Sequence, residues 1–286
     1  MELKNKNITL RFIGGLGNQL FLLVFLEYLS RKLKKKIFID TKSGYQNFLG
    51  GNSFKEKFHL YNLKYNFFIQ NDKLCLLGFY GKIKRFLINR SKFFSYFYNI
   101  EYINEDKNYN IITRIKNSKK KYMYINGYFQ NIRFFSGLEN FIRKIIFQHN
   151  KSIKFLKLNL PKQKTLCICF SNYDYQKNSY KNIFIYKLKK FLENNEKFNY
   201  FVIFSAKKKS REIEQLINSS NIYYINNRSK NNRFYRILLI SKYYYYFIDN
   251  STYYWWGSWL SSFKRKKIYT PLEFHGDRKY KNLVYV

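Results

Sequence analysis

The segment from Tyr245 to Ser261, YYFIDNSTYYWWGSWLS, holds the residues best suited to bind a ligand. An apolar, strand-like run ends in Asn250, Ser251 and Thr252, and all three tryptophans of the chain follow within a few residues. Small hydroxyl and amide side chains after a strand can cap a helix, and the free N–H groups of that helix can hold a phosphate or a carboxylate. The indole rings would fix the packing behind them. The sequence therefore predicts a ligand-binding turn backed by a rigid aromatic cluster; the alternative is that Asn250 only caps a core helix.

A glycine-rich loop near the amino terminus is the second candidate for ligand contact. A predicted strand over residues 8–13 leads into Gly14-Gly15-Leu16-Gly17-Asn18, and residues 19–36 have the pattern of a helix that returns to a strand at 37–40. Glycines let the backbone approach a ligand closely, and Asn18 can cap the helix or hydrogen-bond a sugar or phosphate oxygen. Leu20 stands where the dinucleotide fingerprint needs its third glycine, so Asp40 is not expected to bind a ribose and a nicotinamide enzyme is disfavoured.

Alternating elements in the second half of the chain would position the first candidate. Strand-like runs at residues 165–170, 200–205, 222–225 and 244–248 are separated by helical patterns at 183–192, 211–217 and 234–241. This order predicts a parallel sheet flanked by helices, and ligands bind such sheets beyond the carboxyl ends of the strands. Ser205, residues 250–252 and residues 171–175 each follow a strand, so we expect these three segments to converge on one crevice.

The first half of the chain gives fewer elements. Beyond its β–α–β opening, we predict irregular helices in the stretch from residue 48 to 128, a strand entering a turn at 124–128, and helical spacing at 134–149. Charge and Pro161 interrupt the pattern at residues 151–163. We therefore predict two α/β domains, residues 1–155 and 156–286, each within the usual size of about 100–200 residues.

Two motifs, IGGLGNQLF at residues 13–21 and FIDNSTYYWWGSWL at 247–260, together resemble the bacterial α-1,2-fucosyltransferases, glycosyltransferase family 11. GYFQNIRFF at 127–135 and PLEF at 271–274 resemble further motifs of that family in the same order, so the resemblance covers nearly the whole chain. It implies a fold of the glycosyltransferase B type, with two Rossmann-like domains and parallel sheets. It also implies inverting transfer of fucose from GDP-fucose to the 2-hydroxyl of a galactoside in a bacterial surface glycan, such as a lipopolysaccharide O-chain, without a metal or other cofactor.

The resemblance also implies a site. GDP-fucose would bind the second domain, while Gly15, Gly17 and Asn18 of the acceptor-side first domain would close over the sugar and the acceptor. Asp174 is an available carboxylate to act as the general base, and its alternative role is to cap the loop after a strand. The expected donor contacts in the second domain are Ser171, Asn172, Tyr175, Ser205, Asn250, Ser251 and Thr252.

One motif departs from the family. Its members carry HxRRGDY where this chain has CFSNYDY at residues 169–175, so Ser171 and Asn172 replace both arginines. An arginine fork neutralises a leaving diphosphate, and neither serine nor asparagine supplies that charge. Lys177, Lys181 or residues 207–209, which are all lysine, are candidate substitutes. The loss supports a second hypothesis: a catalytically degenerate homologue that binds a glycan or a partner protein without turnover.

The net charge of +37 bears on partners. Lysines recur along the entire chain with many Asn, Ile, Phe and Tyr residues, as a strongly AT-biased genome would encode, so most short lysine runs are expected to be solvated surface. A basic nucleic-acid binder ranks last because no recognisable binding module is present, and no specific nucleic-acid partner is expected. Anionic membrane surfaces and acidic glycolipids are the remaining partner classes.

Cysteine and histidine give neither a disulfide framework nor a metal site. The chain has three cysteines, of which Cys167 and Cys169 share one face of a predicted strand, and three widely separated histidines. This usage suits a reducing cytoplasm. Because no signal peptide and no apolar run of about 20 residues is visible, we predict a cytoplasmic protein whose membrane contact, if any, is peripheral and on the inner face of the cytoplasmic membrane.

Overall fold

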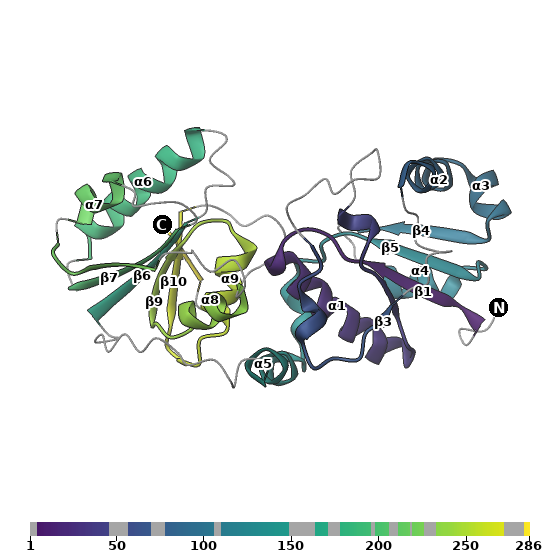
Figure 1. Cartoon of the computed structure of the whole chain (residues 1–286), viewed down its shortest axis with the longest axis horizontal. Helices are drawn as coiled ribbons and strands as arrows, with labels where there is room; N and C mark the ends of the chain where they lie inside the picture. The colour runs from purple at the N-terminus through teal and green to yellow at the C-terminus, as the bar shows by residue number, and fades with distance from the viewer. Residues whose placement is uncertain are drawn as a thin grey trace. The chain divides into compact units, whose positions relative to one another are not determined.

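The computed structural model describes residues 5–45, 57–69, 78–105, 110–148, 164–170, 178–195, 198–205, 211–217, 219–225, 233–271 and 283–286. By its internal contacts the chain divides into two compact units, Met1–Ile145 and Ile146–Val286. Each unit is built on its own sheet of parallel strands with helices beside it (Figure 1). The predicted boundary at residue 155 lies outside the described residues and stays a prediction.

The sheet of the first unit has the strand order β3-β2-β1-β5-β4. Its strands are β1 Asn7–Arg11, β2 Phe38–Asp40, β3 Phe68–Ile69, β4 Ile100–Asn104 and β5 Tyr122–Asn126. β1 lies in the middle and pairs in parallel with β2 and β5, and its apolar residues Ile8 and Leu10 are fully buried. The predicted β–α–β opening is therefore confirmed, with its first strand at the centre of the sheet.

Among the described residues, five α-helices and three short 3-10 helices accompany this sheet. They are α1 Leu16–Leu33, α2 Gly78–Arg90, α3 Lys92–Phe97, α4 Ile111–Asn117 and α5 Glu139–Gln148, with η2 Ser43–Tyr45, η3 Leu60–Asn62 and η4 Ile132–Phe135. The expectation of irregular helices between residues 48 and 128 was incomplete, because β3 and β4 also lie there, whereas β5 overlaps the strand predicted at 124–128. β4 is an edge strand that mixes Glu, Tyr and Asn with isoleucine, so its sequence lacks the continuous apolar run of a buried strand.

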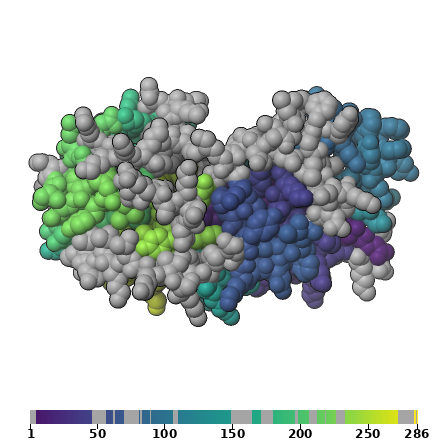
Figure 2. Space-filling model, in the orientation of Figure 1, coloured from purple at the N-terminus to yellow at the C-terminus, as the bar shows by residue number. Residues whose placement is uncertain are grey.

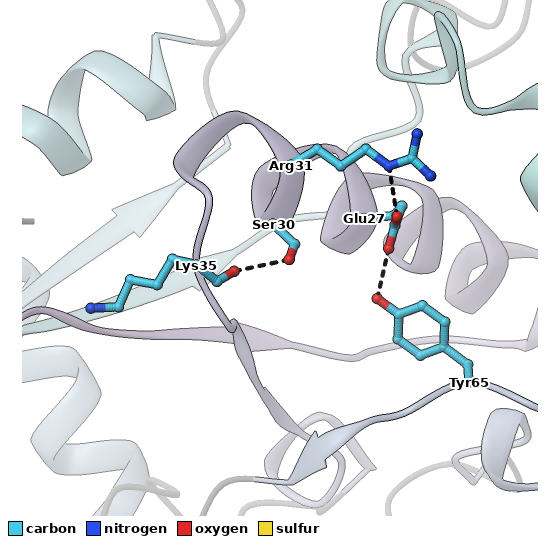
Figure 3. Close-up of polar contacts among 5 residues, drawn as sticks. All are labelled: Glu27, Ser30, Arg31, Lys35 and Tyr65. Atoms are coloured by element: carbon cyan, nitrogen blue, oxygen red, sulfur yellow. Dashed lines mark hydrogen bonds and ion pairs between the residues drawn. The ribbon is translucent and has the colours of Figure 1, made fainter. Parts of the chain in front are cut away.

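Polar contacts fix the carboxyl-terminal end of α1 (Figure 3). Ser30 Oγ donates to the carbonyl oxygen of Lys35 at 2.9 Å, just beyond the end of the helix. One turn earlier, Glu27 accepts from Arg31 Nε at 2.7 Å and from the Tyr65 hydroxyl at 3.0 Å. Burial, and then the neighbouring Glu27 carboxylate, raise the pKa of Tyr65 far above its ordinary value. The segment around Tyr65 is thereby tied to α1.

The sheet of the second unit has the order β11-β10-β9-β6-β7-β8, and all its pairings are parallel. The strands are β6 Thr165–Phe170, β7 Tyr200–Ser205, β8 Ile222–Ile225, β9 Tyr245–Ile248, β10 Lys267–Thr270 and β11 Leu283–Tyr285. The helices are α6 Asn178–Glu193, α7 Arg211–Ile217, α8 Arg233–Ile240 and α9 Thr252–Trp259. Each strand and helix predicted in this half is present, and the bounds of β6, β7, β8 and α7 coincide with the prediction.

The core of the second unit lies on both faces of β6, which is buried along its whole length. Leu166 and Ile168 pack with Phe184 and Leu188 of α6 on one face. α6 and α7 lie beside one another there (Figure 1). The intervening residues Cys167 and Cys169 point to the opposite face, since side chains alternate along a strand. A central strand apolar on both faces is typical of a parallel sheet covered by helices on each side.

Two lysines are buried at helix ends. Lys6 Nζ donates to three carbonyl oxygens at the end of α4, between residues 115 and 118, at 2.6–2.9 Å. Lys266 Nζ donates to the carbonyl oxygens of Trp259 and Ser261 at 2.6 and 2.8 Å, at the end of α9. A cation there satisfies carbonyls that the helix leaves open and complements the negative end of the helix dipole. Both lysines therefore serve the fold, not an anionic partner.

Candidate functional site

Polar residues gather at the carboxyl edge of the second sheet. β6 lies between β7 and β9, with Phe170 in register with Ser205 and Cys169 in register with Ile248. Ser205 ends β7, and Asn250, Ser251 and Thr252 follow β9, so the structure brings these predicted residues to the ends of two strands that flank β6. Ser171, Asn172, Asp174 and Tyr175, which follow β6, lie outside the described residues.

Asp249 holds the turn after β9. Asp249 is buried, its Oδ1 accepts from the backbone N–H of Ser251 at 3.0 Å, and its own N–H donates to Cys169 O at 3.0 Å. α9 begins at Thr252 with Ser251 as its N-cap residue, and the Ser251 side chain makes no capping hydrogen bond. The alternative, in which Asn250 only caps this helix, is not borne out, because the N-cap residue is Ser251 and Asp249 closes the turn. Asn250, Ser251 and Thr252 are each partly exposed.

The predicted aromatic cluster behind this turn is confirmed. Trp255 and Trp256 pack edge to face with ring centroids 5.3 Å apart, and Trp255 stacks on Trp259 at 6.1 Å. All three indoles are almost completely buried. A Cβ atom on Gly257 would come within 2.5 Å of Ile240 Cγ2, so α9 packs closely on α8 at this point. The start of α9 therefore rests on a dense support.

Arg236 of α8 is the cation of this edge. Its side chain is buried, and Nη2 donates to Ser205 O at 2.8 Å and to the Tyr254 hydroxyl at 3.4 Å. Tyr254 in turn donates to Phe170 O at 3.0 Å. The ends of β6 and β7 and the first turn of α9 are thus linked through one guanidinium. Among the described residues, Arg236 Nε is buried without a hydrogen-bond partner.

The electrostatic surroundings of Arg236 favour an anionic ligand. Its hydrogen-bond acceptors within the described chain are a carbonyl and a hydroxyl, both neutral. The guanidinium also lies 5.6 and 5.7 Å from the ring centroids of Phe204 and Tyr254. Burial raises the pKa of Tyr254 and outweighs the lowering by Arg236, so this hydroxyl stays protonated. A buried cation with neutral partners is costly, and an incoming anion would offset that cost.

The glycine-rich loop of the first unit is tighter than predicted. Gly14 has a positive φ of 74°, and Gly15 is the N-cap residue of α1 in an extended conformation. α1 begins at Leu16, so Gly17 and Asn18 lie within its first turn. The expectation that Asn18 caps the helix was wrong, because the helix starts before it. Its Oδ1 instead accepts from Gln130 Nε2 at 3.0 Å, which joins the first motif to the GYFQ segment.

Gln19 holds this loop in place. Its side chain is fully buried, and Nε2 donates to the carbonyl oxygens of Gly14 at 2.9 Å and Lys57 at 2.8 Å. Its Oε1 accepts from the backbone N–H of His59 at 2.8 Å. The side-chain amide therefore satisfies three backbone groups from two segments. Gln19 was present in the quoted motif but was assigned no role, since an amide inside a helical pattern carries no signal of such distant partners.

A second polar group lies at the carboxyl edge of the first sheet. Asp40 is fully buried and accepts hydrogen bonds from the N–H groups of Lys42 and Ser43, from Ser43 Oγ and from the Tyr124 hydroxyl. Arg11 donates to Ser43 and, at 3.0 Å, to Asn126 Oδ1. The Asp40 carboxylate is thus fully engaged by neighbouring protein groups, in agreement with the expectation that it does not bind a ribose.

The described residues contain no group of His, Cys, Asp and Glu side chains that could hold a metal ion. Cys167 and Cys169 share a face as predicted, with their sulfur atoms 3.6 Å apart and both buried. Burial, followed by the neighbouring Cys169, raises the pKa of Cys167 well above its ordinary value, so this thiol is not an activated nucleophile. Within the same residues, no helix has the length and apolarity needed to cross a bilayer.

No protein-family model matches the sequence, and no curated protein matches it. Among solved structures, an arginine-to-lysine mutant of Arabidopsis thaliana FUT1 in complex with GDP is similar with a TM-score of 0.55 and 9% identity, over 93% of this chain and 70% of that one. NodZ α-1,6-fucosyltransferase soaked with GDP-fucose gives 0.45 at 10% identity, over 89% and 92%. A family 9 glycosyl transferase from Veillonella parvula gives 0.41 at 11% identity, over 100% and 87%.

At 9% identity, the similarity to the FUT1 structure is evidence for the fold alone. The chain has an α/β fold of the glycosyltransferase B type, with two Rossmann-like units on parallel sheets, as the resemblance implied. Membership of glycosyltransferase family 11 stays a prediction.

Proposed function

We propose that the protein is a glycosyltransferase that binds GDP-fucose at the carboxyl edge of its second sheet and transfers fucose to the 2-hydroxyl of a galactoside. The observation that carries this proposal is Arg236, a buried cation beneath the ends of β6 and β7, in a fold similar to that of a protein determined with GDP. The acceptor we expect is a bacterial surface glycan. We place the protein in the cytoplasm, where nucleotide sugars are consumed in making such glycans.

The residues of this edge suit a nucleotide diphosphate. Arg236 would stabilise the negative charge that grows on the diphosphate as the sugar leaves. Asn250, Ser251 and Thr252 would bind neighbouring oxygens through their side chains and through the N–H groups at the start of α9, whose dipole favours an anion. Ser171, Asn172, Tyr175 and Ser205 complete the proposed donor contacts.

Inversion requires a single displacement, in which a general base takes the proton of the acceptor hydroxyl as GDP departs. Asp174 remains our candidate for that base. Charge stabilisation by side chains would make a metal unnecessary, so we propose a metal-free transfer. Gly15, Gly17 and Asn18 of the first unit remain the proposed contacts on the acceptor side.

Arg236 could replace part of the positive charge that the family's arginine pair supplies. Ser171 and Asn172 stand where the resembled family has its arginine pair, and removing one electrostatic contact of this kind typically costs ~10²–10³ in rate. Arg236 belongs to α8, a different element, and would return one guanidinium to the same edge of the sheet. This is why we favour an active enzyme.

The test is calorimetric titration with GDP, GDP-fucose, GDP-mannose and ATP at moderate salt. We expect selective binding of GDP and GDP-fucose, and a loss of about 10- to 100-fold in affinity for Arg236→Gln, since a hydrogen bond to a charged group contributes about 1.5–3 kcal/mol. Arg265→Gln, which removes an exposed arginine of the same unit, is the matched control. Arg236→Lys keeps the charge and should fall between the two.

Equal, weak and salt-sensitive binding of every nucleotide would count against the proposal, because charge alone explains it. The loss of both arginines at residues 171 and 172 favours one second candidate, a homologue that binds a glycan or a partner without turnover. Release of GDP from GDP-fucose in the presence of galactosides separates the two. Tight GDP-fucose binding with no release, at any acceptor, would identify the binding protein.

A further inference from the structure

The outer face of α2 and α3 carries large apolar side chains that the fold leaves uncovered. Phe93, Tyr96 and Phe97 of α3 are 69–77% exposed, and Phe86 of α2 is 54% exposed. In the figure these helices lie side by side next to β4, and their side chains form part of the surface of the first unit (Figures 1 and 2). We call this face, formed by Ile83, Phe86, Phe93, Tyr96 and Phe97, the aromatic face.

The aromatic face is not needed to anchor the two helices. Their inner side is already packed on the sheet, where Ile88, Phe94 and Tyr98 join a cluster with Ile100 and Tyr124. The rings of the aromatic face point away from that cluster, since Phe93, Tyr96 and Phe97 remain exposed beside the half-buried Phe94. An exposed apolar patch of this kind, on helices that are otherwise held, marks a contact with something outside the chain.

Cations surround these rings. Residues 78–100 include five lysines and arginines and no aspartate or glutamate. Arg90 lies 4.6 Å from the ring centroid of Phe86, and Lys120 lies 4.4 Å from that of Tyr96. Lys92, which starts α3, is exposed beside Phe93. The aromatic face is therefore bordered by positive charge.

We propose that the aromatic face binds peripherally to a membrane rich in anionic lipid. Rings beside basic residues suit the boundary of a bilayer, where the apolar part enters the acyl region and the cations meet lipid phosphates. A two-helix surface bearing both is complementary to such a membrane in charge as well as in polarity. This goes beyond the proposed transfer, and it would hold the protein beside lipid-linked acceptors.

The test is co-sedimentation of the whole protein with vesicles, at an ionic strength of about 0.15 M so that long-range attraction by the high net charge is screened. One set of vesicles is phosphatidylcholine alone, and the other contains phosphatidylglycerol as well. We expect the protein to bind the second set at least about 10-fold more tightly than the first. The variant Phe93→Ser/Tyr96→Ser/Phe97→Ser should lose about 10-fold or more of that binding.

A matched control is available on α6, where Tyr180, Ile183 and Tyr186 are also exposed. Tyr180→Ser/Ile183→Ser/Tyr186→Ser also removes three large apolar side chains, which are 37–58% exposed, with no change of charge, and should bind vesicles like the wild type. Circular dichroism and thermal unfolding show that each variant is folded. GDP affinity, measured in parallel, should be equal in all three proteins.

Equal vesicle binding by the α3 variant and the wild type would overturn the proposal, and so would an equal loss in the α6 control. A third contrary result is a wild-type dimer that the α3 substitutions convert to a monomer without any effect on vesicle binding, because the aromatic face would then be a protein interface. Failure of GDP binding in the wild type would contradict the proposed function but leave the vesicle result intact.

Discussion

Several side chains that matter most in this protein are polar and hidden. Gln19 fixes the glycine-rich loop through three backbone groups, Asp249 closes the turn after β9, and Arg236 joins the end of β7 to α9. Each satisfies backbone groups that would otherwise be buried without partners. Such residues behave as part of the backbone, so their replacement should be felt in stability before it is felt in chemistry.

Gln19→Leu should lower the free energy of unfolding by about 2–4 kcal/mol, because it leaves two carbonyls and one N–H without their partner while keeping the side-chain volume similar. Chemical denaturation followed by circular dichroism measures this. Gln148→Leu, at a partly exposed helix position, is the control and should stay within about 0.5 kcal/mol. An equally small effect at both positions would mean that the Gln19 contacts do not hold the loop.

Gly14 and Gly137 form a natural pair for testing the loop. Both have a positive φ, 74° and 72°, but a Cβ on Gly14 would lie 2.5 Å from Asn18 Nδ2, whereas a Cβ on Gly137 meets nothing within 4 Å. Gly137→Ala should therefore cost only the backbone strain, about 1–2 kcal/mol, and Gly14→Ala should cost more. Denaturation midpoints of the two variants give the difference. Identical losses would show that Asn18 moves aside freely.

Some residues of the candidate site could be predicted from the sequence, and Arg236 could not. Ser205 and residues 250–252 were placed correctly at strand ends, because a strand followed by small polar residues is a local pattern. Arg236 was not found, since RFYRILLI reads as an amphipathic helix in which an arginine belongs to the solvated face. Its burial depends on strands that are distant in sequence.

Among the elements, α9 is the one whose two ends are held differently. Asp249 supports the turn before it, and the buried Lys266 binds two carbonyls after it. Lys266→Met should destabilise the second unit by about 2–4 kcal/mol, because two charge-assisted hydrogen bonds are lost and the carbonyls stay buried. Lys267→Met, at the exposed neighbouring position, is the control. Thermal unfolding compares them, and equal melting temperatures would refute the capping role.

Elements were predicted more completely in the second unit than in the first. β6 and β7 follow the pattern of buried parallel strands, and the edge strand β8 is also a continuous apolar run; helices of regular spacing separate these strands. β4, also an edge strand, was missed because its sequence IEYIN mixes polar and apolar residues and forms no continuous apolar run. The start of α1 was predicted at residue 19, three residues after its true start. Its first turn includes Leu16, Gly17 and Asn18, which have the composition of a loop. The glycines at residues 14, 15 and 17 disfavour a helix locally, and tertiary contacts impose the helix start there.

For the molecule as a whole, the tyrosines set its behaviour in alkali. Burial is the main cause that raises the pKa of Tyr124, Tyr246 and Tyr254 well above its ordinary value of about 10. Above that pH the unfolded chain has released protons that the folded chain retains, so the stability present below about pH 10 is lost as the pH rises. Each such tyrosine makes the free energy of unfolding fall by about 1.4 kcal/mol per pH unit in this range.

In Tyr246→Phe, the free energy of unfolding should therefore fall less steeply with pH above about 10, by about 1.4 kcal/mol per pH unit. The variant should also be less stable than the wild type at neutral pH, because it loses the hydroxyl hydrogen bonds. Denaturant titrations at a series of pH values, with tyrosinate absorbance recorded alongside, measure both quantities. Tyr186→Phe, at an exposed tyrosine, is the matched control. Tyrosinate that forms gradually while the circular dichroism stays native would contradict the expected coupling of ionisation to unfolding.

The order of strands in the second sheet also affects how the protein is made. β6 is the first strand of that sheet to leave the ribosome, yet it lies between β7 and β9. The half of the sheet formed by β7 and β8 can assemble on it early, while its other edge waits for β9 and remains open to pairing with another chain. A pause in translation between β8 and β9 would therefore lengthen the interval in which a nascent chain can aggregate, and that interval ends when β9 pairs with β6 and brings the tryptophans of α9 into the core.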